Sequence, residues 1–334
     1  MSRTLPELRA ILLEDPSAIV DLPPAERARV AALLEANRLE ALAYVRLKER
    51  GSEDRVPPEI LAAWKLAYAL AVGRSLAYAE ALREALDLAA SKALPVRLLR
   101  GTQLAFFAYP RPETRPLDDL ELQTPPDAAG ILHRALKSLR FSELEDVAVE
   151  GPPDPGDDGR ALPLLARDGV TLRVCRKSLL GRDSAPWDPF SDSARAFSRP
   201  RILKPEPLVV LLAEEAARRS FCRSLRTIVD LHVVSEVLRP SWGDVADLAA
   251  EAGLALETYL ALVVLADAFG PAAEESCLEE LRARSGCAPA ALELLKKLAR
   301  AAVALYPLPA RLAEFVGRLL RTSRPSPSEA RRAY

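Results

Sequence analysis

Apolar residues recur every three or four positions through much of the first ninety residues, which is the spacing of one face of an α-helix. The longest such run covers residues 58–92 and includes apolar positions from Ile60 to Leu86. An earlier helix start is marked by Pro23-Pro24, since proline is favoured in the first helical turn. We interpret the long run as a packing face and residues 1–92 as an N-terminal helical region.

From residue 93 the pattern changes to short apolar runs separated by turn residues, which is typical of strands. Arg167-Asp168-Gly169 lies between two of these runs and is a hairpin turn signal. Two segments keep helical spacing, and the second begins after Pro125-Pro126 with Asp127 as its expected N-cap. Residues 93–180 are therefore predicted to form one α/β block. Its expected strands lie near 96–100, 118–124, 143–149, 162–166 and 170–175, and its expected helices near 102–109 and 127–139.

The remainder of the chain returns to helical spacing after an irregular stretch. Residues 181–205 combine Ser, Asp and Pro with scattered aromatic residues, and we expect a linker or lid loop there. Residues 206–321 are predicted to form a C-terminal helical domain, and the polar residues 322–334 a disordered tail. The predicted fold class is α+β, with a small mixed sheet flanked by N-terminal and C-terminal helical regions. The C-terminal helices are expected near 206–221, 223–238, 242–252, 255–268, 272–285, 288–305 and 308–321.

Composition narrows the classes of function. The 334 residues include 46 basic and 47 acidic side chains, and this balance makes nucleic acid an unlikely partner, since such binders carry a basic excess. The four cysteines contain no Cys-x-x-Cys pair, so neither zinc nor a disulfide framework is indicated. The N-terminus lacks the apolar core of a signal peptide, and we find no window that approaches the roughly 18 apolar residues needed to span a bilayer. We therefore expect a cytoplasmic protein that does not contact a membrane.

Candidate chemistry is concentrated between Leu98 and Thr124. Arg100-Gly101-Thr102 follows an apolar strand, and two acids, Asp119 and Glu121, alternate on the next predicted strand. Strand residues two positions apart point to the same face, so these carboxylates can share a divalent cation. The backbone N–H groups of the Gly-Thr turn can hold a phosphate. The spacing therefore predicts a metal site beside a phosphate site.

These residues resemble those of the polymerase-β-type nucleotidyltransferases, and specifically a bacterial family of uncharacterised nucleotidyltransferases. The resemblance rests on a strand ending in Arg100-Gly101, on Tyr109-Pro110 closing the next helix, and on Arg115 four residues before Asp119-Leu120-Glu121. It continues into the C-terminal half through the segment Leu225-x-x-Ile228-Val229-Asp230-Leu231. It implies that the small mixed sheet is of the polymerase-β type.

The resemblance also implies an activity and a ligand set. The reaction would transfer a nucleoside monophosphate from a nucleoside triphosphate, with ATP the expected donor, to an unknown hydroxyl acceptor. The paired acids would be the catalytic residues and would hold Mg²⁺ or Mn²⁺. By position, the metal ligands are Asp119 and Glu121, and the nucleotide-binding residues are Arg100, Gly101, Thr102 and Arg115.

Departures from the family pattern leave a second interpretation open. Glu121 stands where the family has aspartate, and Thr171 and Arg173 stand on the strand where a third carboxylate is expected. Asp168 or Glu145 would have to replace that carboxylate. The alternative is a catalytically degenerate protein that keeps the fold and acts as a binding or interaction module. A third interpretation is a helical scaffold in which the α/β block is structural only.

Overall fold

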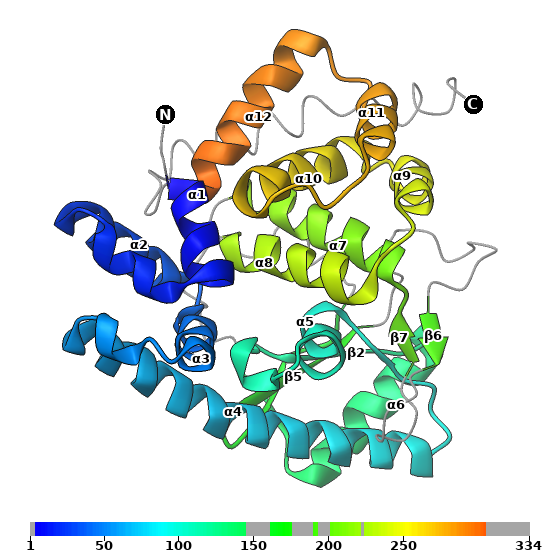
Figure 1. Cartoon of the computed structure of the whole chain (residues 1–334). Coiled ribbons are helices and arrows are strands. Elements are labelled where there is room, and N and C mark those ends of the chain that lie inside the picture. The colour runs from blue at the N-terminus through cyan, green and yellow to red at the C-terminus, as the bar shows by residue number, and fades with distance from the viewer. Residues whose placement is uncertain (1–3, 145–160, 176–189, 193–200, 222–223, 305–334) are drawn as a thin grey trace. The chain divides into compact units, whose positions relative to one another are not determined.

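The computed structural model describes residues 4–144, 161–175, 190–192, 201–221 and 224–304. The chain divides into two compact units, one formed by Met1–Ala69 with Pro205–Tyr334 and the other by Leu70–Lys204. The boundary near residue 70 falls inside one long helix, α4 (Pro58–Ser91), which is labelled in Figure 1. The α/β block predicted over residues 93–180 lies within the second unit.

The first unit is helical throughout its described part. Its central helix, α10 (Ala255–Phe269), is apolar around most of its circumference and is almost completely buried, as expected for a helix enclosed by others. It contacts α7, α9, α11 and α12, and it also contacts α1 near the N-terminus. The other helices of this unit are α1 (Thr4–Arg9), α2 (Pro24–Ala36), α3 (Glu40–Arg50), α7 (Pro205–Arg218), α8 (Leu225–Val233), α9 (Trp242–Glu251), α11 (Glu275–Arg284) and α12 (Pro289–Ala304), with single turns at Ala10–Glu14, Pro16–Asp21, Glu53–Arg55 and Val234–Leu238.

The second unit is built on a mixed sheet with the strand order β3-β4-β5-β2-β1-β7-β6. β2 runs parallel to β5 and antiparallel to β1, and all four of its residues are buried. The hydrophobic core of this unit includes Leu120 and Leu122 of β2, Leu172 of β5 and Leu82 of α4. The strands are β1 (Arg97–Leu98), β2 (Leu120–Gln123), β3 (Ser142–Glu143), β4 (Leu165–Arg167), β5 (Val170–Cys175), β6 (Phe190–Asp192) and β7 (Arg201–Leu203); the helices besides α4 are α5 (Arg100–Gln103), which continues into a π-helical turn at Leu104–Ala108, and α6 (Pro126–Leu136), with single turns at Pro112–Thr114 and Lys137–Leu139.

The predicted α+β class is confirmed: a small mixed sheet is accompanied by helical regions on both sides of it in the sequence. Residues 181–205, expected to be a linker or lid loop, include the two strands β6 and β7, and β7 pairs with β1 in the sheet. Three-residue strands are too short to show an alternating pattern, so only their pairing reveals them. The predicted helix 308–321, the tail 322–334 and most of the strand expected over 143–149 lie outside the described residues.

Among the described helices, α4 alone is long and apolar enough to cross a membrane by length and composition. Little of its most apolar stretch is buried. This finding differs from the expectation that no window of the sequence approaches the length of a membrane span. One helix of this kind is weak evidence for a membrane span.

Candidate functional site

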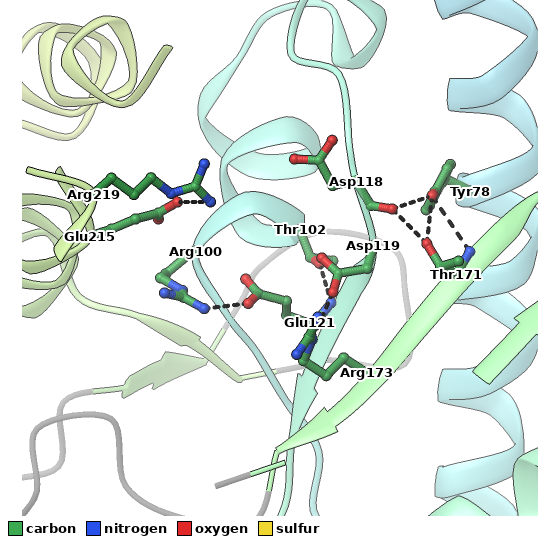
Figure 2. A network of polar contacts seen from close by, with 10 residues as sticks. All are labelled: Tyr78, Arg100, Thr102, Asp118, Asp119, Glu121, Thr171, Arg173, Glu215 and Arg219. Atoms are coloured by element: carbon green, nitrogen blue, oxygen red, sulfur yellow. Dashed lines mark hydrogen bonds and ion pairs between the residues drawn. The ribbon is translucent and has the colours of Figure 1, made fainter. Parts of the chain in front are cut away.

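The two candidate acids lie at the start of β2, in the middle of the sheet. Glu121 is the second residue of β2 and is 8% exposed, and Asp119 directly precedes the strand. Their side chains point into the same space, as Figure 2 shows. The sheet therefore brings the two carboxylates together as the alternation of the sequence predicts.

Thr102 contacts the backbone of Glu121. Its Oγ1 accepts a hydrogen bond of 2.7 Å from the Glu121 N–H, and it is fully buried. The Leu99 N–H donates a hydrogen bond to the Glu121 carbonyl at 3.2 Å. This second bond also joins the segment around α5 to β2, with Glu121 now as the acceptor. The Thr102 hydroxyl thus holds α5 against β2. The sequence predicted a nucleotide-binding role for this residue, and that role stays a prediction.

Arg100 donates a hydrogen bond from Nη2 to Oε1 of Glu121, forming an ion pair (Figure 2). Arg100 has a backbone φ of 21°, an unusual value for a residue with a Cβ atom. Backbone strain of this kind is often found where a side chain must be held in a functional position. The positive charge that the sequence assigned to a nucleotide phosphate is therefore directed at a carboxylate here.

Gly101 gives Arg115 room to approach the backbone. A Cβ atom built on Gly101 would lie 3.0 Å from Nη1 of Arg115, closer than such contacts normally come. The Arg115 side chain is buried, and its Nη1 donates to the Pro116 carbonyl at 3.1 Å. A side chain at position 101 would therefore require the guanidinium group of Arg115 to shift. Arg100 and Thr102 each bond to Glu121, and Arg115 lies against Gly101; the nucleotide-binding role of these four residues stays a prediction.

Arg173 is the residue of the site whose role the sequence analysis missed. β2 and β5 pair in parallel with Glu121 beside Arg173, so both side chains lie on one face of the sheet. Nε of Arg173 donates to Oδ2 of Asp119 at 2.8 Å (Figure 2). The sequence showed only that this strand lacks an acid. A basic residue alternating on the strand expected to neighbour the acids was the available signal.

Thr171, two residues earlier on β5, supports the backbone next to the acids. Its hydroxyl donates to the Asp118 carbonyl at 2.5 Å, and the Tyr78 hydroxyl of α4 donates to the same carbonyl at 2.8 Å. These bonds join α4, β2 and β5 at one point, as Figure 2 shows. Asp118 itself has an exposed side chain.

The pKa of Asp119 is raised above its ordinary value, chiefly because burial removes water from the carboxylate and also because Glu121 is a neighbouring negative charge. Arg173 and Arg100 act in the opposite direction. Burial lowers the pKa of Arg173, but the charges of Asp119 and Glu121 outweigh it and leave that pKa raised. Each arginine thus compensates a carboxylate that would otherwise be poorly solvated.

The donor set does not fit a pair of divalent ions. In the part of the chain that the structure describes, no group of three or more His, Cys, Asp or Glu side chains could hold a metal. Two-metal catalysis needs ligands that bridge and flank both ions. Asp168 lies in the turn between β4 and β5, and Glu145 lies outside the described residues. Asp119 and Glu121 fit one ion, provided that their guanidinium partners move.

Comparison with known proteins supports the family that the sequence resembles. A model of the family described as uncharacterised nucleotidyltransferase matches residues 23–270, which is most of the chain, so the chain belongs to that family. The predicted family is confirmed. No curated protein and no solved structure matches the chain.

Proposed function

We propose that this chain binds a nucleoside triphosphate at Asp119 and Glu121 and has lost two-metal nucleotidyl transfer. The observation that carries the proposal is Arg173, which lies beside Glu121 in the parallel register and donates to Asp119 at 2.8 Å. A guanidinium group on that strand supplies positive charge where a third metal ligand would supply negative charge. The geometry thus favours the degenerate alternative over the full reaction.

One divalent ion is compatible with the residues present. Mg²⁺ in phosphate-binding proteins is commonly held by one or two carboxylates together with phosphate oxygens, so Asp119 and Glu121 suffice. When bound, the ion would neutralise phosphate charge. Arg100 and Arg173, released from the carboxylates, would be free to donate to phosphate oxygens, because guanidinium groups bind phosphate and carboxylate in the same way.

The second candidate is the transfer of a nucleoside monophosphate from a triphosphate, with ATP the expected donor, to a hydroxyl acceptor in the cytoplasm. Family membership favours it. Asp119 and Glu121 would then be catalytic with Mg²⁺ or Mn²⁺. It requires an additional ligand to enter the site and both arginines to leave it.

The two candidates are separated by measuring binding and transfer on the same preparations. Calorimetric titration with ATP, and then with the other nucleoside triphosphates, is carried out in Mg²⁺, in Mn²⁺ and in EDTA. We expect binding in the presence of a divalent ion that is lost in EDTA and in Asp119→Asn. Asp87→Asn, which removes an exposed acid on α4, is the matched control and should bind as the wild type does.

Transfer is measured with ATP labelled on the α-phosphate, by following pyrophosphate release and label incorporation. The proposal expects neither from the wild-type protein. Arg173→Asp adds a third carboxylate and is expected to increase the affinity for Mn²⁺. Transfer by the wild type would establish the second candidate instead. If no nucleotide binds under any metal condition, or if Asp119→Asn binds unchanged, the proposed site is wrong and the interaction-module alternative remains.

A further inference from the structure

The helix α4 has apolar residues on two opposite sides. On one side Trp64, Tyr78 and Leu82 are buried, with 2%, 2% and 0% of their surfaces exposed. On the other side Leu66, Leu70 and Leu76 are 62%, 61% and 68% exposed. A helix that packs against one domain needs only one apolar side. We call the second side, formed by Ala62, Leu66, Ala69, Leu70, Gly73 and Leu76, the outer face of α4.

Gly73 lies in the middle of this outer face. Glycine weakens the interior of a helix relative to alanine. A Cβ atom built on Gly73 would meet nothing within 4 Å, so no neighbour among the described residues requires its absence. Small residues at the centre of a helix surface allow a second helix to come close. Gly73 and the exposed leucines are therefore two independent signs of a partner.

A repeat with alternating steps of three and four residues runs along this side of α4, and we call it the seam; Leu70 of the outer face is not part of it. The seam consists of Glu59, Ala62, Leu66, Ala69, Gly73, Leu76, Glu80 and Arg83. This is the spacing of a coiled-coil seam. The seam spans 25 residues, about 36 Å at the rise of an α-helix. It lies on a single continuous helix.

We propose that the outer face of α4 binds the outer face of a second copy, with the two helices antiparallel about a two-fold axis that crosses the seam at the level of residue 71. The pairing places Leu66 of one copy against Leu76 of the other. It also places Ala69 against Gly73, two small residues of the seam, beside this axis. Isologous contact of this kind is the commonest way in which identical chains associate.

Charge at the ends of the seam selects the antiparallel direction. Glu59 of one copy faces Arg83 of the other, and the two-fold axis makes this attractive contact twice. A parallel pair would instead place Glu59 against Glu59 and Arg83 against Arg83, which repel. The third charged seam residue, Glu80, lies opposite Ala62 in the antiparallel arrangement. The residues themselves thus specify a second copy as the occupant.

A lipid bilayer is the competing occupant, since α4 meets the length and composition of a membrane span. A spanning helix must expose its whole circumference to lipid or to other spanning helices. On α4 the Tyr78 hydroxyl is hydrogen-bonded to the Asp118 carbonyl, and Trp64 is buried in the protein. Only the outer face of α4 could therefore contact lipid, and a charged residue lies at each end of it, Glu59 at one end and Arg83 at the other.

The test is the mass of the full-length protein as a function of concentration, by sedimentation equilibrium. We expect twice the chain mass of 36.4 kDa, with a dissociation constant on the order of micromolar for a seam with this few large apolar residues. Leu76→Glu and Gly73→Leu should each raise that constant at least about a hundredfold, because the symmetry places two changes in every dimer. Gly73→Ala adds only a methyl group and should weaken the dimer less than Gly73→Leu does.

Charge exchange tests the orientation. Glu59→Arg and Arg83→Glu should each weaken the dimer, and the double variant should restore it. Leu294→Glu, which changes an exposed leucine on α12, should leave the dimer intact. All the residues changed in these variants are exposed, so circular dichroism should show that each variant folds as the wild type does.

A monomer at all concentrations up to about 100 µM, well above that micromolar constant, would overturn the proposal. So would a dimer that survives both Leu76→Glu and Gly73→Leu. Cosedimentation of the wild type, but not of Leu76→Glu, with phosphatidylcholine–phosphatidylglycerol vesicles would assign the face to a membrane.

Discussion

Replacing Arg173 with methionine should destabilise the protein mainly at neutral pH. The substitution keeps a long flexible side chain on β5 but removes the hydrogen bond and the charge directed at Asp119. Asp119 is then left beside Glu121 with its own carboxylate poorly solvated. The loss is therefore electrostatic rather than a loss of packing.

The magnitude follows from how exposed the pair is. Breaking a fully buried ion pair by removing one partner costs roughly 3–5 kcal/mol, whereas exposed pairs contribute at most about 1 kcal/mol. The side chains of Arg173 and Asp119 are 37% and 19% exposed, so this pair lies between these limits. We expect Arg173→Met to lower the free energy of unfolding by about 2 kcal/mol near neutral pH.

The pH dependence gives the sharper test. The folded-state pKa of Asp119 is already raised, and Arg173 is one of the groups that hold it down, so its removal raises that pKa further. An acid with a raised folded-state pKa binds protons more tightly in the native state than in the unfolded state. Stability then falls as pH rises from the unfolded value, about 3.9, through the folded value. The penalty of Arg173→Met should be full at neutral pH and shrink in acid.

Urea denaturation followed by circular dichroism, near pH 7.5 and near pH 4.5, measures both free energies. The double variant Arg173→Met with Asp119→Asn should recover most of the loss, because no unpaired carboxylate remains. Arg46→Met, which removes an exposed pair with Glu49 on α3, should change stability by no more than about 0.5 kcal/mol. An equal penalty for Arg173→Met at both pH values, or no recovery in the double variant, would refute the electrostatic explanation.

Three further outcomes are expected from the same structure. Thr102→Val should cost about 1–3 kcal/mol of stability in urea denaturation, because the buried Glu121 N–H loses its acceptor, whereas Thr102→Ser should cost much less. Tyr78→Phe should lower stability by about 1 kcal/mol by removing the hydroxyl bonded to the Asp118 carbonyl, and an unchanged midpoint would count against that bond. Cys175, whose pKa burial raises to about 12, should resist N-ethylmaleimide at neutral pH in the folded protein and react after unfolding, as mass spectrometry of tryptic peptides would show.

The local elements were accessible from the sequence because they depend on periodicity over a few residues. The long apolar run that predicted helix 58–92 appears as α4, and the alternation of Asp119 and Glu121 appears as two carboxylates on one side of β2. The α+β class follows from the same short-range patterns. The sequence also shows that no acid stands between residues 170 and 175, so β5 contributes no carboxylate to the site.

The tertiary structure decided what those residues contact. Asp119 and Arg173 are 54 positions apart, and only the parallel pairing of β2 with β5 places the guanidinium beside both acids. Likewise, the sequence shows that α4 is apolar, but only packing separates the buried side with Trp64 from the exposed side with Leu66. Periodicity is a property of neighbouring residues, whereas strand register and burial depend on contacts between distant segments, and these contacts determine which charges in the site are compensated.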